Sequence, residues 1–153
     1  MSSPPPIEIR DATETDLPAI LAMLADDMLG AGRDSGAVDP AYGQALRAIQ
    51  AEPNTRQLVA VEAGRVVGCF QLSFLPGLSR QGSWRAQIEA VRVARARRGG
   101  GIGAAMMRWA VEQARQRGCS LIQLTTDKRR SDAHRFYRRL GFEASHEGMK
   151  LLL

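Results

Sequence analysis

Two different spacings of hydrophobic residues divide the chain into helical and extended stretches. Between residues 17 and 24 the apolar positions fall three or four apart, which is the spacing of one face of an amphipathic helix. Thr13 is suited to cap the start of this helix, and Asp16 holds the position that completes a capping box. From Gln57 onward the helical spacing gives way to extended runs with a period nearer two, which predicts β-strands. The chain therefore combines both kinds of element.

The predicted elements follow one another in a mixed order. The strands are Ile7–Arg10, Gln57–Glu62, Arg65–Leu75, Ser83–Val93, Leu121–Thr125, Phe142–Ser145 and Met149–Leu153. The helices run from Thr13 to about Leu29, over residues 40–51, from a glycine-rich loop at Gly103 to about Arg117, and over Ser131–Leu140. This order predicts an α+β (mixed α/β) fold with a central, mostly antiparallel twisted sheet flanked by helices. Residues 1–6 are expected to be a disordered lead-in, and residues 7–153 a single domain.

Charge is distributed unevenly along the chain. Residues 1–90 carry seven arginines against eleven acidic residues, whereas residues 91–153 carry twelve arginines and two lysines against five acidic residues. The net charge of +5 therefore hides a strongly basic second half. Such a half indicates an anionic partner, unless it is only a solvated basic face.

The remaining composition excludes several classes of protein. The sequence holds no run of about 18 apolar residues, so we expect no membrane span. Cys69 and Cys119 lie in apolar runs without a CxxC spacing, which predicts buried free thiols and a reducing, cytoplasmic location. With these cysteines, His134 and His146 are too few to predict a zinc site, and no metal is expected.

A glycine-rich loop joins a predicted strand to a predicted helix. It reads Arg97-Arg98-Gly99-Gly100-Gly101-Ile102-Gly103. Glycines let backbone amides face one point, and the free amides and dipole of the following helix favour an anion there. The arginines add positive charge at the rim, and the alternative is a flexible connector. Ala104 stands where a P-loop needs lysine, and residues 113–126 hold no acidic residue to bind a ribose. Neither a P-loop nor a dinucleotide site is therefore favoured.

The loop resembles that of the GNAT superfamily of acetyl-CoA-dependent N-acetyltransferases. Arg98, Gly101 and Gly103 match its Gln/Arg-x-x-Gly-x-Gly/Ala signature. Val91 and Val93 match the apolar pair that ends its preceding strand.

A second segment strengthens this resemblance. Residues 133–142 are similar to the family's Ala-x-x-x-Tyr…Gly-Phe segment, with Tyr137 and Gly141-Phe142 at the family's spacing. The order of elements matches too, so the resemblance implies a GNAT fold over nearly the whole chain.

The resemblance implies acetyl-CoA as cosubstrate and residues to hold it. Backbone groups of Val91 and Val93 would pair with its pantetheine arm. Tyr137 would be the general acid that protonates the leaving thiolate, since a phenol is a suitable proton donor for a thiolate. Otherwise Tyr137 is a structural aromatic beside Phe136. The amides that would hold the pyrophosphate are those of Arg98, Gly99, Gly100, Gly101, Ile102 and Gly103.

Glu89 is the candidate group for the acceptor amine. It stands in the strand before the loop, where a period of two places it on one face with Gln87, Val91 and Val93. A carboxylate on an otherwise apolar strand is costly unless it is used or paired. Family members often use a glutamate of this strand, acting through water. We therefore expect Glu89 to be the general base or a substrate anchor, with a structural ion pair to an arginine as the alternative.

The resemblance implies an acyltransferase that moves acetyl directly to the primary amine of a small molecule. The C-terminal segment is similar to GNATs that act on small aminoalkyl compounds, including aminoalkylphosphonates. The alternatives are an acetyltransferase acting on a protein lysine or N-terminal amine, and a non-catalytic CoA-binding module. No nucleic-acid partner is expected, because no aromatic residues lie among the arginines. Family habit suggests a homodimer. Four acidic residues around the first two helices either attract a cationic amine or are solvated: Asp26, Asp27, Asp34 and Asp39.

Overall fold

The computed structural model describes residues 3, 5–26 and 39–153. The chain forms two compact units, Met1–Gln123 and Leu124–Leu153. The first unit holds the sheet and most of the helices, and the second holds one helix and the C-terminal segment. This division does not test the disordered lead-in over residues 1–6 or the single domain over residues 7–153, and both stay predictions.

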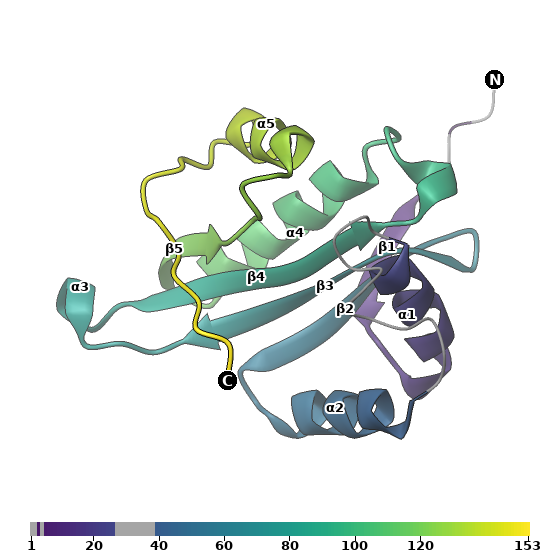
Figure 1. Ribbon diagram of the computed structural model, residues 1–153, viewed down its shortest axis with the longest axis horizontal. Coiled ribbons are helices and arrows are strands. Elements are labelled where there is room, and N and C mark those ends of the chain that lie inside the picture. Colours follow the sequence, from purple (N-terminus) through teal and green to yellow (C-terminus); the bar gives the residue numbers. More distant parts are fainter. Residues whose placement is uncertain (1–2, 4, 27–38) are drawn as a thin grey trace. The chain divides into compact units, whose positions relative to one another are not determined.

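A five-stranded sheet with the order β1-β2-β3-β4-β5 is the centre of the first unit (Figure 1). The strands are β1 Ile7–Asp11, β2 Thr55–Glu62, β3 Arg65–Leu75, β4 Trp84–Val93 and β5 Cys119–Leu124. The pairs β1–β2, β2–β3 and β3–β4 are antiparallel. The predicted mixed fold with a mostly antiparallel sheet is confirmed, and β3 has the predicted bounds.

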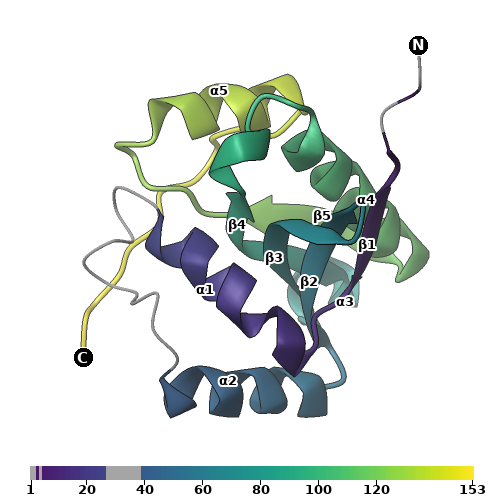
Figure 2. The ribbon, with the colours of Figure 1, turned by 90° about the vertical axis from the view of Figure 1, so that its right-hand side faces the viewer.

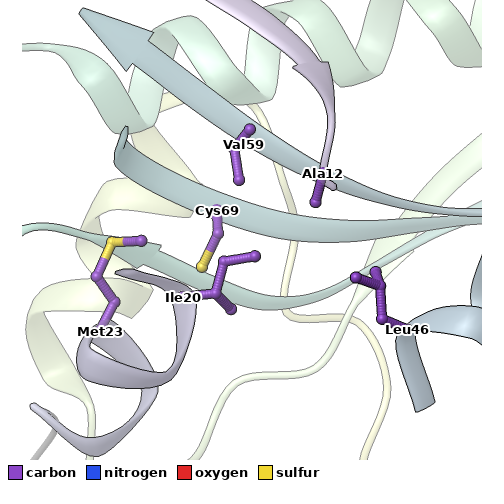
Figure 3. Packing of buried hydrophobic residues seen from close by; sticks show 6 residues of the cluster. All are labelled: Ala12, Ile20, Met23, Leu46, Val59 and Cys69. Carbon is purple, nitrogen blue, oxygen red and sulfur yellow. The ribbon is translucent and has the colours of Figure 1, made fainter. Parts of the chain in front are cut away.

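Helices cover both faces of this sheet (Figure 2). They are α1 Leu17–Ala25, α2 Pro40–Ala51 and α4 Ile102–Gln116, and a short turn, α3 Ser79–Gly82, joins β3 to β4. Val59 and Cys69, opposite each other on β2 and β3, lie in one buried cluster with Ile20 of α1 (Figure 3). Phe70, the next residue of β3, points to the other face and contacts Trp109 of α4, with ring centroids 6.1 Å apart. No helix in the described part of the chain is long and apolar enough to cross a bilayer.

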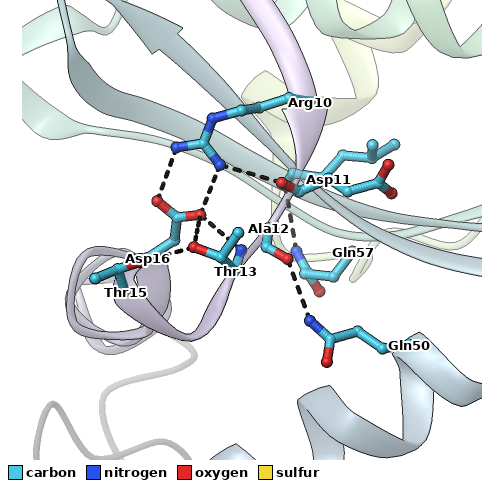
Figure 4. Close-up of polar contacts among 9 residues, drawn as sticks. Arg10, Asp11, Ala12, Thr13, Thr15, Asp16, Gln50 and Gln57 are labelled. Carbon is cyan, nitrogen blue, oxygen red and sulfur yellow. Dashed lines mark hydrogen bonds and ion pairs between the residues drawn. The ribbon is translucent and has the colours of Figure 1, made fainter.

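A polar network fixes the short 3-10 turn Glu14–Asp16 that leads into α1 (Figure 4). The Arg10 guanidinium donates to both carboxylate oxygens of Asp16, at 2.7 and 3.0 Å. The backbone amide of Thr13 donates to Asp16 at 2.8 Å, as the predicted capping box requires. Asp16 is 6% exposed, and the Arg10 hydrogen bond is the main cause that holds the pKa of its carboxyl below the ordinary value. Gln50 of α2 donates to the Ala12 carbonyl at 3.5 Å, which links the second helix to the same turn.

Helix α1 ends earlier than the sequence predicts. It stops at Ala25 rather than near Leu29, because Asp26 leaves the helical conformation with a ψ of 46°. The carboxylate of Asp26 binds the distant Arg95. A contact between residues so far apart in the sequence cannot be predicted from the local pattern around Asp26.

The two predicted C-terminal strands, Phe142–Ser145 and Met149–Leu153, are wrong. Residues 142–153 form neither helix nor strand, and Leu151 is 85% exposed. An apolar pattern favours a strand, but only hydrogen bonds to a neighbouring strand hold it in place. The sequence pattern contains no information on whether that neighbour exists.

The second unit contains α5 Ser131–Arg139. The amide of Gly141 donates to the Arg138 carbonyl at 3.0 Å, and that of Phe142 donates to the Tyr137 carbonyl at 3.1 Å. Gly141 has a φ of 97°, the left-handed conformation that glycine provides at a helix end. The predicted helix closed by Gly141 is confirmed to within one residue.

Replacing Asp16 with alanine tests the cap. We expect Asp16→Ala to lower the free energy of unfolding by about 2–3 kcal/mol, because the change removes both carboxylate bonds of the Arg10 guanidinium and the acceptor of the Thr13 amide. Denaturant unfolding at pH 7 measures the difference.

Asp11→Ala is the matched control. Asp11 pairs with Arg56 through two bonds of 2.9 Å, but its side chain is 63% exposed, so we expect about 0.5–1 kcal/mol. The pKa of Asp16 is lowered in the folded chain. The stability that the ionised Asp16 provides is therefore fully present at pH values above the ordinary carboxyl pKa of about 4. It is lost as the pH falls through the lowered pKa of the folded chain. Equal costs for the two variants, or an Asp16 effect that persists in acid, would contradict the assignment.

Candidate active site

Strand β4 carries one residue more than its partner at the centre of the sheet. Cys69 of β3 lies opposite Arg92, and Gln71, two residues later on β3, lies opposite Glu89, three residues earlier on β4. Ala90 has a φ of 52°, which is left-handed and uncommon for a residue with a side chain. The extra residue is a β-bulge, a feature that re-aims side chains and is frequent next to active sites.

The bulge changes which side chains share a face. Residues directly opposite each other on antiparallel strands point to the same side of the sheet. Glu89 and Arg92 therefore share the face on which Cys69 packs against α1. Val93 lies opposite Gly68 and points to the other face. The prediction that Val93 shares the face of Glu89 is therefore wrong, because strict alternation ends at Ala90.

Two glutamines contact the carboxylate of Glu89, and a third contacts one of these glutamines. Gln87 donates to one carboxylate oxygen of Glu89 at 3.1 Å, and Gln71 donates to the other at 3.4 Å. Gln123 of β5 donates to the Oε1 atom of Gln87 at 2.9 Å. The carboxylate of Glu89 is exposed and contacts amides rather than an arginine in the part of the chain described here.

The glycine-rich loop leads directly into α4. Gly99 and Gly101 have φ values of 80° and 84°, and a Cβ atom on either would meet nothing within 4 Å. Gly101 is the N-cap of α4, without a capping side chain, and its carbonyl accepts from the Ala105 amide at 3.0 Å. Ile102, 2% exposed, fixes the first turn in the core. The amides at this helix start have no carbonyl four residues earlier in the helix, so they are available to an anion.

Two other amides of the predicted cradle are used within the loop. The Arg98 amide donates to the Arg95 carbonyl at 3.4 Å, and the Gly100 amide donates to the Arg97 carbonyl at 3.3 Å. The donors that best suit an anion are therefore concentrated in the first turn of α4 rather than spread evenly from Arg98 onward.

The arginines of the loop have structural partners. Arg97 donates to both carboxylate oxygens of Glu62, at 2.7 and 2.8 Å. This contact ties the loop to the end of β2 and raises the pKa of Arg97 above its ordinary value. Arg95 and Arg98 both reach Asp26 at the end of α1, the latter with a 3.3 Å bond to its carbonyl. Arg97 is thus a tether, not the free charge at the rim that the sequence indicates.

The acidic residues expected around the first two helices have separate roles. Asp39 caps α2, accepting from the Ala41 amide at 2.9 Å. Asp26 holds the loop arginines, and Asp27 and Asp34 lie outside the described residues.

Tyr137 lies in the second unit. It is half-buried on α5 between Phe136 and Phe142, with ring centroids 5.0 and 5.7 Å away. These aromatic neighbours pack against its ring, as the alternative of a structural aromatic residue requires. The role of Tyr137 as a general acid stays a prediction.

The cysteines are free thiols, as the sequence predicts. Burial raises the pKa of Cys69 to about 12, so this thiol stays protonated and is a poor nucleophile. Cys119 is only half-buried, which corrects the prediction for that residue. No group of three or more His, Cys, Asp or Glu side chains suited to a metal occurs among residues 3, 5–26 and 39–153.

Sequence reasoning placed Gln87 on the face of Glu89, but it missed Gln71, Gln123 and the tethers of the loop. Gln71, Gln87 and Gln123 lie on three strands, and only the strand register brings them together. The alternation that places Gln87 and Glu89 two residues apart was the one available signal.

Comparison with known proteins identifies the family of the chain. Residues 18–142 match the sequence model of the acetyltransferase (GNAT) family. The chain is 34% identical to an aminoalkylphosphonate N-acetyltransferase of Salmonella typhimurium, over 93% of this chain and 88% of that protein.

Two solved structures share the fold closely. A transcriptional regulator from Bacillus halodurans has a TM-score of 0.94 and 49% identity, covering 97% of this chain and 100% of that one. A putative acetyltransferase from Agrobacterium tumefaciens has a TM-score of 0.85 and 29% identity, covering 95% and 99%. Since the family match and the curated relative both extend over most of the chain, this protein belongs to the GNAT family of acetyltransferases.

Proposed function

We propose that this acyltransferase moves an acetyl group from acetyl-CoA directly to the primary amine of a small molecule. The observation that carries the proposal is the start of α4. Gly101 is the left-handed N-cap and has no capping side chain. The first amides of the helix therefore have no hydrogen-bond acceptor within the helix. An uncapped first turn with a helix dipole suits the diphosphate of CoA. Bound acetyl-CoA would supply the thioester from which the acetyl group is taken.

The residues after the bulge would bind CoA, and the residue before it would bind the acceptor amine. The amides from Arg98 to Gly103, chiefly those in the first turn of α4, would hold the diphosphate. The backbone of Val91 and Val93 would align the pantetheine arm as though it were a neighbouring strand. Glu89, on the opposite side of Ala90, would face the acceptor amine as base or anchor.

Tyr137 would donate the proton that the departing thiolate needs. An ordinary phenol has a pKa of about 10 and a thiol one of about 8.5, so a phenol can protonate a thiolate that is forming under a general-acid mechanism. No cysteine nucleophile is required, which agrees with the protonated, buried Cys69.

The acceptor is proposed to be a small amine. Support comes from the similarity to an aminoalkylphosphonate N-acetyltransferase over most of both chains. A protein lysine or N-terminal amine, and a role in CoA binding without catalysis, are the competing functions.

An acceptor screen tests the proposal directly. The protein is incubated with acetyl-CoA and a panel of aminoalkylphosphonates, uncharged amines and lysine peptides, and release of the CoA thiol is measured. We expect the highest turnover with a small amine. Preference for the peptides would select the protein-acetylating alternative, and calorimetry that detects no affinity for CoA would overturn the proposal.

The Gly101→Ala variant tests the diphosphate cradle. A left-handed alanine costs about 1–2 kcal/mol, which shifts the first turn of α4 and should raise the Kd of CoA about tenfold. Gly118→Ala is the matched control: Gly118 has a φ of 74° and equally open space around a Cβ, but follows the far end of α4. Equal CoA affinity in the two variants, measured by calorimetry, would argue against the cradle.

The Tyr137→Phe variant tests the proton donor. The phenyl ring keeps its packing against Phe136 and Phe142, so we expect Kd for CoA within about twofold and a kcat lower by about a hundredfold or more. Tyr42→Phe, which alters the other tyrosine of the chain, is the control in the same steady-state assay. An unchanged kcat for Tyr137→Phe would show that the proton comes from elsewhere.

A further inference from the structure

A chain of side-chain amides ends on the carboxylate of Glu89. Gln123 donates to Gln87 at 2.9 Å, and Gln87 donates to Glu89 at 3.1 Å. From the other side Gln71 donates to the second carboxylate oxygen at 3.4 Å. The four residues come from β3, β4 and β5.

The network fixes the direction of the Gln87 amide. An ionised carboxylate only accepts hydrogen bonds, so the NH₂ end of Gln87 must face Glu89. The Gln123 amide then donates to the oxygen end of Gln87. A rotated Gln87 amide would lose both bonds, so Gln123 stabilises the orientation that Glu89 requires.

The donors hold the carboxylate without cancelling its charge. Hydrogen bonds to an ionised acceptor are stronger than those between neutral groups. Because Glu89 is exposed, a ligand from solvent can still reach the remaining lone pairs. A carboxylate held in this way is suited to bind a cation.

We propose that Gln71 and Gln87 are positioning residues for Glu89, that Gln123 acts through Gln87, and that Glu89 binds the ammonium form of the acceptor. This inference rests on the proposed function. The acceptor then arrives as a protonated amine. Before attack one N–H bond of the ammonium breaks, and its proton passes to a solvent water molecule beside the exposed carboxylate.

A double-mutant cycle tests the positioning role. Gln87→Leu should raise the KM for the amine about fivefold and Glu89→Gln about tenfold, the range for a lost hydrogen bond to a charged group. In both variants kcat and the KM for acetyl-CoA should stay within about twofold. In the Glu89→Gln background, Gln87→Leu should have no further effect.

The control is Gln57→Leu. Gln57 lies opposite Gln71 on the same face, but its amide donates to the Phe70 carbonyl at 3.1 Å instead of to Glu89, so the amine KM should not change. Gln123→Leu, which removes only the second link, should raise the amine KM less than Gln87→Leu does. An undiminished Gln87→Leu effect in the Glu89→Gln background, or a loss confined to kcat for Glu89→Gln, would overturn the proposal.

A second measurement separates this inference from the proposed function. In Glu89→Ala, the side-chain NH₂ signals of Gln71 and Gln87 in NMR spectra should move toward those of free glutamine, while the Gln57 signals stay in place. This readout needs no turnover, so an inactive wild-type protein would refute the acetyltransferase proposal and still leave the network measurable. Unchanged Gln71 and Gln87 signals would refute the network itself.

Discussion

The extra residue at Ala90 is the constraint on which the arrangement of the site depends. Its φ of 52° is unfavourable for alanine, at a cost of about 1–2 kcal/mol. Pairing on both sides of the bulge over-determines the conformation, with Gln71 opposite Glu89 before it and Cys69 opposite Arg92 after it. The same strand therefore presents a carboxylate on the face that α1 covers and then continues, with its alternation reversed, into the glycine-rich loop. A regular β4 would place Glu89 and Val93 on one face, as the sequence pattern alone predicted.

Several arginines in the basic second half of the chain form ion pairs within the protein and are not free to bind a ligand. Arg97 is held by Glu62, and Arg95 and Arg98 by Asp26, so acidic residues of the first half balance part of the positive loop. The Glu62 side chain is 12% exposed, and a partly buried pair of this kind fixes geometry rather than attracting ligands. Anion binding then depends chiefly on backbone amides and on the helix dipole at the start of α4.

Local patterns made most of the elements predictable, and long-range contacts account for the failures. The capping box at Thr13, the glycine stop at Gly141 and the apolar run that forms β3 are read within a few residues, and the structure contains all three. The bulge carries no local signal, because alanine is not a residue that favours positive φ. The early end of α1 follows a contact between residues 69 positions apart. The C-terminal strands failed because a partner strand is a property of the fold and not of the segment.

Carboxylates in this protein are held in two chemically different ways. Asp16 and Glu62 each accept two bonds from an arginine, which neutralises their charge and suits a structural role. Glu89 is held by the amides of Gln71 and Gln87, which orient the group and leave its full negative charge in place. An arginine at either glutamine position would repel an incoming ammonium as well as pairing with the carboxylate. Two side-chain amides from neighbouring strands hold this exposed carboxylate, in a chain with nineteen arginines, and that arrangement suits a group that acts on a ligand.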